Sequence, residues 1–279
     1  MAWMKKLLIS GYGDIARRAG PQLEGRYAVQ PLSRRHGFDL DRAETLAALL
    51  GADAVLHCAP PPNSGKQDTR TRHLLAALAK GRILPARVVY VSTSGVYGDC
   101  GGARVDESRA LCPQTDRARR RVDAERQLAL WCNERDVALV ILRVPGIYAA
   151  DRLPLERLRA GTPVLHAVDD VYTSHVHAED LAAIVVRALE DAAPPGTYNA
   201  SDDSEIRMGD WFDLVAERVG LPRPPRIARA EAAGRISPEL LSFMSESRRL
   251  ANRRMKENLG VRLRFPTVFE GVPVSMGAA

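Results

Sequence analysis

The sequence predicts an α/β fold in which helices cover both faces of a doubly wound parallel sheet. Short runs of β-branched and aliphatic residues alternate with segments of helical composition from the first residues onward. Alternation of this kind is typical of βαβ units, whose strands lie parallel. Hydrophobic residues make up 46% of the 279 residues and charged residues 27%, so a buried core is expected and disordered or coiled-coil classes are disfavoured.

Five apolar runs are predicted as buried strands, namely 6–10, 27–32, 54–59, 88–92 and 137–142. Helical composition and spacing are found between them over 43–50, 69–79 and 116–131. After Arg143 the pattern changes, because three prolines divide the chain into short elements. The later segments are predicted as helices over 178–188 and 208–219, loops over 194–196 and 221–225, and an irregular tail from Gly260.

A glycine-rich turn follows the first predicted strand. The chain there reads Ile-Ser-Gly-Tyr-Gly-Asp-Ile-Ala, a GxGxxA match at a strand-to-helix junction, where a dinucleotide-binding loop belongs. Gly11 permits the tight turn, Gly13 lets backbone N–H groups approach a pyrophosphate, and Ala16 keeps the helix close to the strand. The helix N-terminus, with Asp14 and Ile15 in its first turn, favours an anion. An ordinary glycine turn is the alternative, but the position after the strand favours a nucleotide site.

The end of the second predicted strand bears on the choice of cofactor. NAD-binding proteins usually place an acid there, which accepts hydrogen bonds from the adenosine ribose. This chain has Ser33, Arg34 and Arg35 and no acid. Guanidinium groups can clamp a 2′-phosphate, so NADP is favoured over NAD as the cofactor. The alternative is that the two arginines are solvated on a loop.

The composition argues against several other classes of protein. The formal net charge is +6, yet basic and acidic residues are interleaved and no aromatic-basic stripe indicates a nucleic-acid partner. The four cysteines have no metal-binding spacing, so free thiols and no metal site are expected. No signal-peptide core and no membrane-spanning run is recognised, so a cytoplasmic location without a membrane partner is expected.

Seven stretches occur in the order that one protein family shows. They are Gly11 to Ala16, Asp39-Leu40, His57-Cys58-Ala59, Val-Ser-Thr-Ser-Gly-Val-Tyr-Gly at 91–98, Arg-Val-Pro-Gly-Ile-Tyr at 143–148, Ser-His-Val-His-Ala-Glu-Asp-Leu at 174–181, and Tyr198-Asn199. Together they resemble the extended and atypical short-chain dehydrogenase/reductases, specifically the NAD-dependent epimerase/dehydratase family. The resemblance spans most of the chain, and the combination is specific although no single stretch is.

The resemblance implies a Rossmann-like NAD(P)-binding domain over 1–150 and a smaller substrate-binding region over 151–279, interleaved with the sheet edge. By position, Asp39 and Leu40 would flank the adenine. The other implied cofactor contacts are Ala59, Pro60, Ser92, Pro145 and Gly146. Thr93 takes the place of the family's catalytic serine or threonine, a neutral donor that polarises a substrate carbonyl or hydroxyl. The alternative role for Thr93 is to satisfy backbone groups at a strand end.

The sequence departs from the family at its proton-transfer pair. Members that transfer hydride carry YxxxK, in which the lysine lowers the pKa of the tyrosine. Aligning Pro113 and Glu125 with the family's proline and glutamate places Arg117 at the tyrosine position and Arg121 at the lysine position. No tyrosine stands four residues before any of the five lysines, so the pair occurs nowhere in the chain. Arginine stays protonated, so standard dehydrogenase chemistry is disfavoured, while Arg121 stays a candidate contact to ribose or phosphate.

Two tyrosines and two histidines are further candidates. Tyr97 and Tyr148 are possible substitutes for the missing tyrosine, and Tyr97 joins Thr93 and Arg121 as a candidate catalytic residue; packing is the favoured alternative for both rings. His175 and His177 are predicted to lie on a strand that leads into a helix rather than in a metal site.

Two functions follow from these expectations. One is an NAD(P)-binding epimerase, dehydratase or oxidoreductase whose catalysis is altered or lost, and the other is a non-enzymatic NADP-sensing regulator. The expected partner is a small-molecule substrate, anionic or a sugar nucleotide. Residues 248–254, Arg-Arg-Leu-Ala-Asn-Arg-Arg, either bind such an anion or form a solvated helix face. A homodimer is expected by analogy with related proteins.

Overall fold

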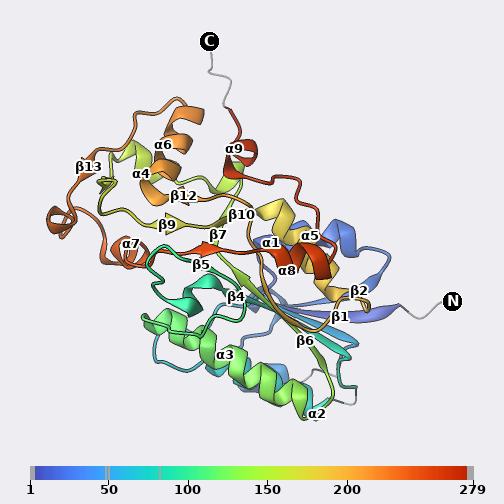
Figure 1. Cartoon of the computed structure of the whole chain (residues 1–279). Helices are drawn as coiled ribbons and strands as arrows, with labels where there is room; N and C mark the ends of the chain where they lie inside the picture. The colour runs from blue at the N-terminus through green and yellow to red at the C-terminus, as the bar shows by residue number, and fades with distance from the viewer. Residues whose placement is uncertain (1–3, 48, 50, 82, 275–279) are drawn as a thin grey trace.

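A six-stranded parallel sheet forms the centre of the computed structural model, which describes residues 4–47, 49, 51–81 and 83–274 (Figure 1). From one edge to the other its strands are β2 (Tyr27–Leu32), β1 (Lys5–Ser10), β3 (Ala54–His57), β4 (Arg87–Thr93), β6 (Ala138–Val144) and β11 (Gly196–Asn199). Each neighbouring pair is parallel. The chain runs from β1 to β2 on one side and then crosses to β3 on the other, which makes a topological switch point at β1.

Helices cover both faces of the sheet, as the alternation predicts (Figure 1). The helices α1 (Asp14–Leu23) and α5 (Ala178–Leu189) pack together on one face, and α2 (Thr69–Lys80) and α3 (Asp116–Asn133) pack together on the other. Three of these four helices begin and end within a few residues of the predicted bounds, and α1 begins where the glycine turn predicts it.

Side chains of β1 pack into two separate cores, because successive residues of a strand point to opposite faces of the sheet. Leu7 and Ile9 belong to the core beneath α1 and α5, whereas Leu8 belongs to the core beneath α2 and α3. All three side chains are at most 1% exposed. The central strands are therefore buried on both faces, which explains their continuous apolar runs.

The prediction is wrong at three elements. The strand β2 is an edge strand with Val29 exposed rather than a buried one, and Pro31 fits that position because it has no N–H to donate. The sixth strand, β11, begins at Gly196, which the prediction placed in a loop. The predicted helix over 43–50 is only a 3-10 turn, η2 (Ala43–Leu46), and its residues 48 and 50 lie outside the described part of the chain.

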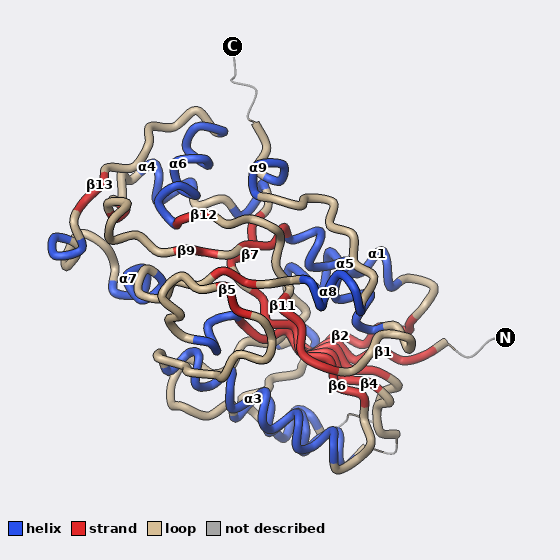
Figure 2. The backbone as a smooth tube through the Cα atoms, in the orientation of Figure 1, coloured by secondary structure: helices blue, strands red, loops and turns tan. Residues whose placement is uncertain are grey.

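The chain after β6 forms short elements gathered at the end of the sheet where β6 leads into β7 (Figure 2). Its small ladders pair β7 (Gly146–Tyr148) with β10 (His175–His177), β8 (Val164–Leu165) with β13 (Arg226–Ile227), β9 (Tyr172–Thr173) with β12 (Ile206–Arg207), and β14 (Arg249–Leu250) with β5 (Arg104–Val105). The helices are α4 (Leu155–Arg159), α6 (Met208–Arg218), α7 (Pro238–Phe243), α8 (Arg253–Asn258) and α9 (Val268–Gly271). The remaining 3-10 turns are η1 (Arg34–His36), η3 (Ser94–Tyr97), η4 (Ala150–Arg152) and η5 (Arg229–Glu231).

These short elements enclose a third core, built around Trp211, Phe212 and Val215 of α6. The same part of the chain also supplies α5 and β11 to the central sheet, so its elements interleave with those of the first half. Among the residues that the structure describes, no helix is both long and apolar enough to cross a membrane.

Candidate functional site

The predicted glycine turn lies at the carboxyl end of β1, at the switch point, where open α/β sheets bind their ligands. Gly11 has a φ of +81°, a left-handed conformation that favours glycine. A Cβ added at Gly11 would lie 2.4 Å from the backbone nitrogen of Ala59. The turn after β1 therefore passes against the loop after β3 with no room for a side chain.

The N-terminus of α1 faces open space. Gly13 is the N-cap residue and supplies no side chain to cap the helix. A Cβ added at Gly13 would meet only the Gly11 carbonyl oxygen, at 3.9 Å. The unpaired N–H groups of the first turn and the positive end of the helix dipole therefore face an uncovered space. Ile15 and Ala16 are buried below, so their side chains do not cover these N–H groups, and an anion at a helix N-terminus requires such free N–H groups.

The carboxylate of Asp14, at the start of α1, is held by two arginines. The Nε atom of Arg18 donates to it at 3.0 Å, and an Nη atom of Arg152 donates to it at 2.9 Å. Arg18 also donates to Glu179 at 2.5 Å and to Asp151 at 2.6 Å. Both arginines thus pair with Asp14, and Arg18 shares its charge with two further carboxylates.

The residues predicted to contact adenosine follow β2. The Oγ atom of Ser33 lies 2.7 Å from Nδ1 of His36, and both Arg34 and Arg35 are exposed. Leu40 is 9% exposed and packs in the core beneath α2. Polar side chains thus follow β2, with Leu40 buried behind them.

Arg70 of α2 joins the loop after β2 to the loop after β3. It donates two hydrogen bonds to Asp41, at 2.7 and 2.6 Å, and one to the carbonyl of Pro60 at 3.0 Å. The contact with Arg70 lowers the pKa of the Asp41 carboxyl. Arg34 lies 3.6 Å from Asp39 and 3.5 Å from Asp41, so these two carboxylates balance part of its charge.

Ser92 and Thr93, at the end of β4, have different surroundings. Ser92 is 3% exposed and donates to Glu125 at 2.6 Å, inside the protein. Thr93 accepts a hydrogen bond from the Gly95 nitrogen at 3.3 Å and also lines a cavity. The backbone role and the position at a candidate site therefore coexist at Thr93.

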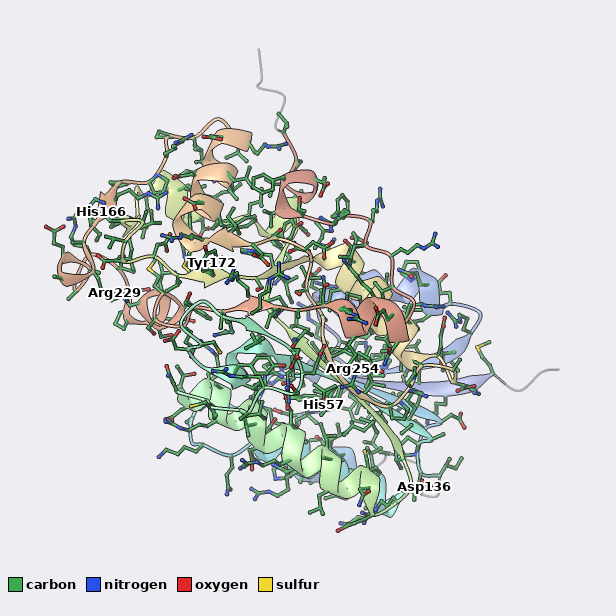
Figure 3. The ribbon with its side chains drawn as sticks, in the orientation of Figure 1. His57, Asp136, His166, Tyr172, Arg229 and Arg254 are labelled. Atoms are coloured by element: carbon green, nitrogen blue, oxygen red, sulfur yellow. The ribbon has the colours of Figure 1, made fainter. Side chains whose placement is uncertain are left out.

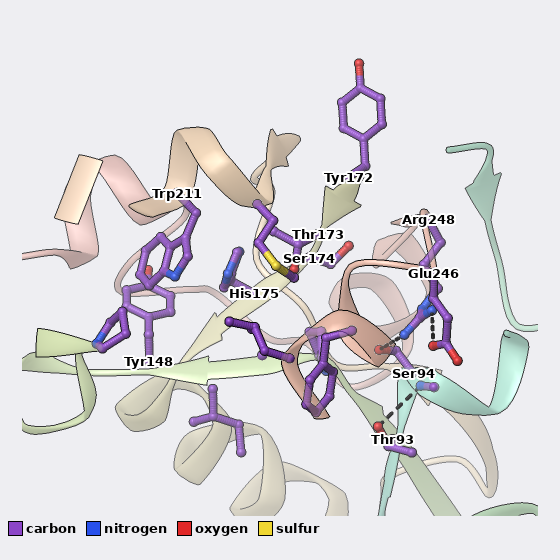
Figure 4. A pocket seen from close by; sticks show the side chains of 18 of the residues that line it. Thr93, Ser94, Tyr148, Tyr172, Thr173, Ser174, His175, Trp211, Glu246 and Arg248 are labelled. Atoms are coloured by element: carbon purple, nitrogen blue, oxygen red, sulfur yellow. Dashed lines mark hydrogen bonds and ion pairs between the residues drawn. The ribbon is translucent and has the colours of Figure 1, made fainter. Parts of the chain in front are cut away.

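This cavity of about 300 Å³ lies between the end of β4 and the elements of the second half (Figure 4). Its apolar wall includes Ile147, Tyr148, Trp211, Phe212, Leu240 and Phe243. Its charged lining consists of Arg117, Arg152, Arg157, Arg248 and Glu246. Pro145 and Gly146, predicted to lie near the nicotinamide, line the same cavity as Thr93. The structure thus brings three of the predicted site residues together at one pocket.

The two arginines at the YxxxK positions have separate roles. Arg117 lines the cavity with its guanidinium carbon 4.1 Å from the centre of the Phe243 ring, and burial lowers its pKa. Arg121 instead donates to the hydroxyl of Tyr90 and to the carbonyl of Val91, both at 3.0 Å. Its guanidinium therefore braces β4 from α3.

The candidate tyrosines do not share one environment. Tyr97 is 1% exposed, and its hydroxyl donates to Asn199 at 2.8 Å and accepts from Arg143 at 2.9 Å. These bonds hold Tyr97 inside the protein, outside the cavity lining. Tyr148 does line the cavity, but its hydroxyl donates to the Thr267 carbonyl at 3.2 Å and burial raises its pKa. Both hydroxyls have structural partners, as the packing alternative expects.

His177, His175 and His57 are buried and lie in three different environments. His177 ends β10 and accepts from the first turn of α5 through Nδ1, so the predicted strand-to-helix junction is confirmed. His175 lines the cavity with its ring centre 4.4 Å from that of Trp211, and burial lowers its pKa to about 3. Burial also lowers the pKa of His57 to about 3 inside the sheet (Figure 3). Among the described residues, no group of three or more His, Cys, Asp or Glu is placed to hold a metal ion.

The basic run at 248–254 is divided between the two roles that its sequence allows. Arg248 lines the cavity and donates to Glu246 at 2.8 Å, whereas Arg253 is exposed and pairs with Glu257 at 2.7 Å. Arg249 pairs with Glu205 at 3.1 Å. Sequence reasoning did not find Glu246, because it lies in an irregular segment with no motif or periodicity around it.

Asp202 lies close to Tyr148, and its burial is expected to make the stability of the protein depend on pH. It is 3% exposed, its Oδ2 atom has no hydrogen-bond partner among the described residues, and burial raises its pKa to about 7. An unfolded aspartate titrates near ~4, so the folded state binds more protons between about pH 4 and 7 and stability falls as pH rises through that window. We expect Asp202→Asn to flatten this slope in urea unfolding at a series of pH values. The exposed Glu231→Gln should keep the wild-type slope, and equal slopes for all three proteins would contradict the assignment.

Comparison with solved structures supports this fold over nearly the whole chain. A functionally unknown conserved protein from Silicibacter pomeroyi DSS is 30% identical, with 96% of this chain and 97% of that chain covered and a TM-score of 0.75. The structure of RMD from Pseudomonas aeruginosa complexed with NADPH is 17% identical, with 97% of each chain covered and a TM-score of 0.75. The structure of MoeE5 in complex with UDP-glucuronic acid and NAD is 20% identical, with 96% and 97% covered and a TM-score of 0.73.

No curated protein matches the chain at a significant level. Residues 12–201 match the family described as the NAD dependent epimerase/dehydratase family. The matched segment begins inside the glycine turn and ends just after β11, so it includes the start of α1, Thr93 and the Pro145-Gly146 wall of the cavity. The chain therefore belongs to the NAD-dependent epimerase/dehydratase family.

Proposed function

We propose that the protein binds NAD(P) across the switch point and holds a small substrate in the cavity beside Thr93. The observation that carries this proposal is the Gly11 turn against Ala59, which leaves the N-terminus of α1 open to a pyrophosphate. RMD with its NADPH and MoeE5 with its NAD and UDP-glucuronic acid share the fold, which supports the proposal. Titration with NADPH and NADH, followed by calorimetry, tests it, and absence of binding to both would reject it.

The predicted residues fit the cofactor in three groups. Gly11, Gly13 and the first turn of α1 would hold the pyrophosphate, while the loop after β2 would hold the adenosine. Thr93, Pro145 and Gly146 would lie at the nicotinamide end, where they meet the cavity. The bound nicotinamide supplies hydride exchange with a carbon of the substrate. Thr93 would orient that substrate by donating to its carbonyl or hydroxyl oxygen.

Our proposal does not use the family's tyrosine–lysine pair for proton transfer. Arg117 occupies the cavity wall and Arg121 is held by Tyr90 and Val91, and neither guanidinium gives up its proton near neutral pH. The lack of a group that can exchange a proton at the YxxxK positions favours a second candidate function, a non-enzymatic NADP-sensing regulator. Nicotinamide absorbance recorded with a panel of sugar nucleotides separates the two: turnover supports an enzyme, and tight cofactor binding without turnover supports the sensor.

We expect Arg35→Ala to reduce affinity for NADPH by about tenfold and to leave affinity for NADH unchanged. The physical reason is that Arg35 is exposed at the adenosine rim and would donate to the 2′-phosphate, whereas Asp39 and Asp41 balance part of the charge of Arg34. Calorimetry with both cofactors measures the effect, and Arg26→Ala, an exposed arginine beyond α1, serves as the control. Preference of the wild-type protein for NADH would overturn the assignment.

A homodimer is a further proposal that rests on family resemblance, and a cytoplasmic location is one that rests on the cysteine spacing and on the lack of a recognised signal-peptide core or membrane-spanning run. Light scattering at several protein concentrations tests the dimer.

A further inference from the structure

Arg117 is an unpaired cation in the wall of the cavity. It is half-buried, and burial lowers the pKa of its guanidinium, which shows that its charge is incompletely solvated. Its neighbours on α3 are satisfied: Arg119 pairs with Asp116 at 2.7 Å and Arg121 donates to Tyr90 at 3.0 Å. Within the described ranges, Arg117 makes neither an ion pair nor a hydrogen bond and only faces the Phe243 ring. Burying half of a cationic side chain without a partner costs free energy, and a bound anion would offset that cost.

The one acid in the cavity lining does not balance Arg117. Glu246 pairs instead with Arg248, through a hydrogen bond of 2.8 Å, and their side chains are 5% and 13% exposed. Arg248 also donates to the Gly98 carbonyl at 3.0 Å, which fixes the pair at one end of the cavity (Figure 4). The Glu246–Arg248 pair is therefore neutral as a unit. The cavity lining keeps a net positive charge from Arg117, from the exposed Arg157 and from Arg152, which pairs with Asp14 outside the lining.

The rest of the wall favours an apolar ligand body. Trp211 and Phe212 of α6 and Leu240 and Phe243 of α7 line the cavity, together with Tyr148. The cavity volume of about 300 Å³ lies at the lower end of the range for small-molecule sites, roughly 300–1,000 Å³. Arg117 is the half-buried guanidinium of this wall that has no partner among the described residues, whereas Arg157, which also lines the cavity, is exposed to solvent. Such a wall suits a compact molecule with an anionic group and an apolar body.

We propose that this cavity binds a compact organic acid, in which a carboxylate on an aromatic or aliphatic body pairs with Arg117. The guanidinium fork matches a carboxylate with two parallel hydrogen bonds, and the ring of Phe243 shields that pair from water. Only one part of this inference rests on the proposed function, namely that the bound acid lies beside the nicotinamide. A whole sugar nucleotide is larger than a cavity of about 300 Å³ accommodates.

The test compares acids with their neutral amides. Phenylacetate, benzoate and hexanoate, each beside its amide, are titrated into the wild-type protein and into Arg117→Met and Arg119→Met, with calorimetry as the readout. Arg119→Met removes the same charge from the same helix outside the cavity. We expect at least one acid to bind about tenfold or more tightly than its amide, Arg117→Met to abolish that difference, and Arg119→Met to retain it.

A third variant tests whether the positive charge of the cavity attracts the acid. Glu246→Gln removes the negative charge near Arg117 and frees Arg248, so acid binding should become tighter while amide binding stays constant. The inference is overturned if no acid binds or if acids and amides bind with equal affinity. It is also overturned if Arg117→Met and Arg119→Met bind acids alike, or if UDP-glucose is the one ligand whose binding depends on Arg117.

NADPH titration of the same proteins keeps the two proposals separate. If cofactor binding is absent and acid binding is retained, the proposed function is rejected and this inference stands.

Discussion

Gly13→Asp is expected to reduce affinity for NAD(P) at least about a hundredfold while the protein stays fully folded, because like charges in a binding site cost several kcal/mol. Gly13 is the N-cap of α1 with a φ of −97°, and a Cβ there meets only one atom, at 3.9 Å. Aspartate is among the best N-cap residues, so its side chain would accept from the free N–H groups of the first turn. The same carboxylate would then occupy and repel the site of the pyrophosphate. Calorimetric titration with NADPH and thermal unfolding of the apo protein measure the two effects.

Gly13→Asn is the matched control. Asparagine caps a helix about as well as aspartate and carries no charge, so the difference between the two variants isolates the repulsion. We expect Gly13→Asn to bind NADPH more weakly than the wild type and much more tightly than Gly13→Asp. Wild-type affinity in both variants would place the cofactor elsewhere. Gly11→Ala is less informative, since its Cβ would lie 2.4 Å from Ala59 and would disturb the fold itself.

The sequence predicts the glycine turn and the start of α1 well because their physical requirements are local. A strand, a glycine turn and a helix N-terminus follow one another within a dozen residues, and each element has its own pattern. Their meeting with Ala59 follows from the parallel order of β1 and β3, which the βα alternation already predicts. The structure therefore places the predicted residues Gly11, Gly13 and Ala59 around one space.

The cavity could not be predicted in the same way, since its wall joins residues from distant, short elements. Arg117 comes from α3, Trp211 from α6, Phe243 from α7 and Glu246 from an irregular segment. Only tertiary packing brings them together, and no local pattern reports such packing. The strand β11 was missed for a related reason: it is four residues long and begins with a glycine after two prolines, a composition typical of loops.

Glu125→Met is expected to lower the free energy of unfolding by about 3–5 kcal/mol, because it leaves the charge of Arg143 buried without a partner. The two side chains are 6% and 8% exposed, and Arg143 donates to Glu125 at 2.8 Å. Ser92 donates to the same carboxylate at 2.6 Å, and Arg143 also donates to Tyr97 at 2.9 Å. The pair thus joins α3 to the ends of β4 and β6, directly behind Thr93. Urea unfolding at neutral pH measures the loss.

A double-mutant cycle decides whether the loss comes from the orphaned charge. Arg143→Met alone leaves the Glu125 carboxylate buried and should also cost several kcal/mol, whereas the double variant removes both charges and replaces them with apolar side chains. We therefore expect the double variant to be more stable than the sum of the single effects by about 2 kcal/mol or more. Additive effects would show that each side chain contributes packing alone. Since this pair supports the strand ends that carry Thr93 and Pro145, a coupled result would also show how the buried network positions the predicted nicotinamide end of the site.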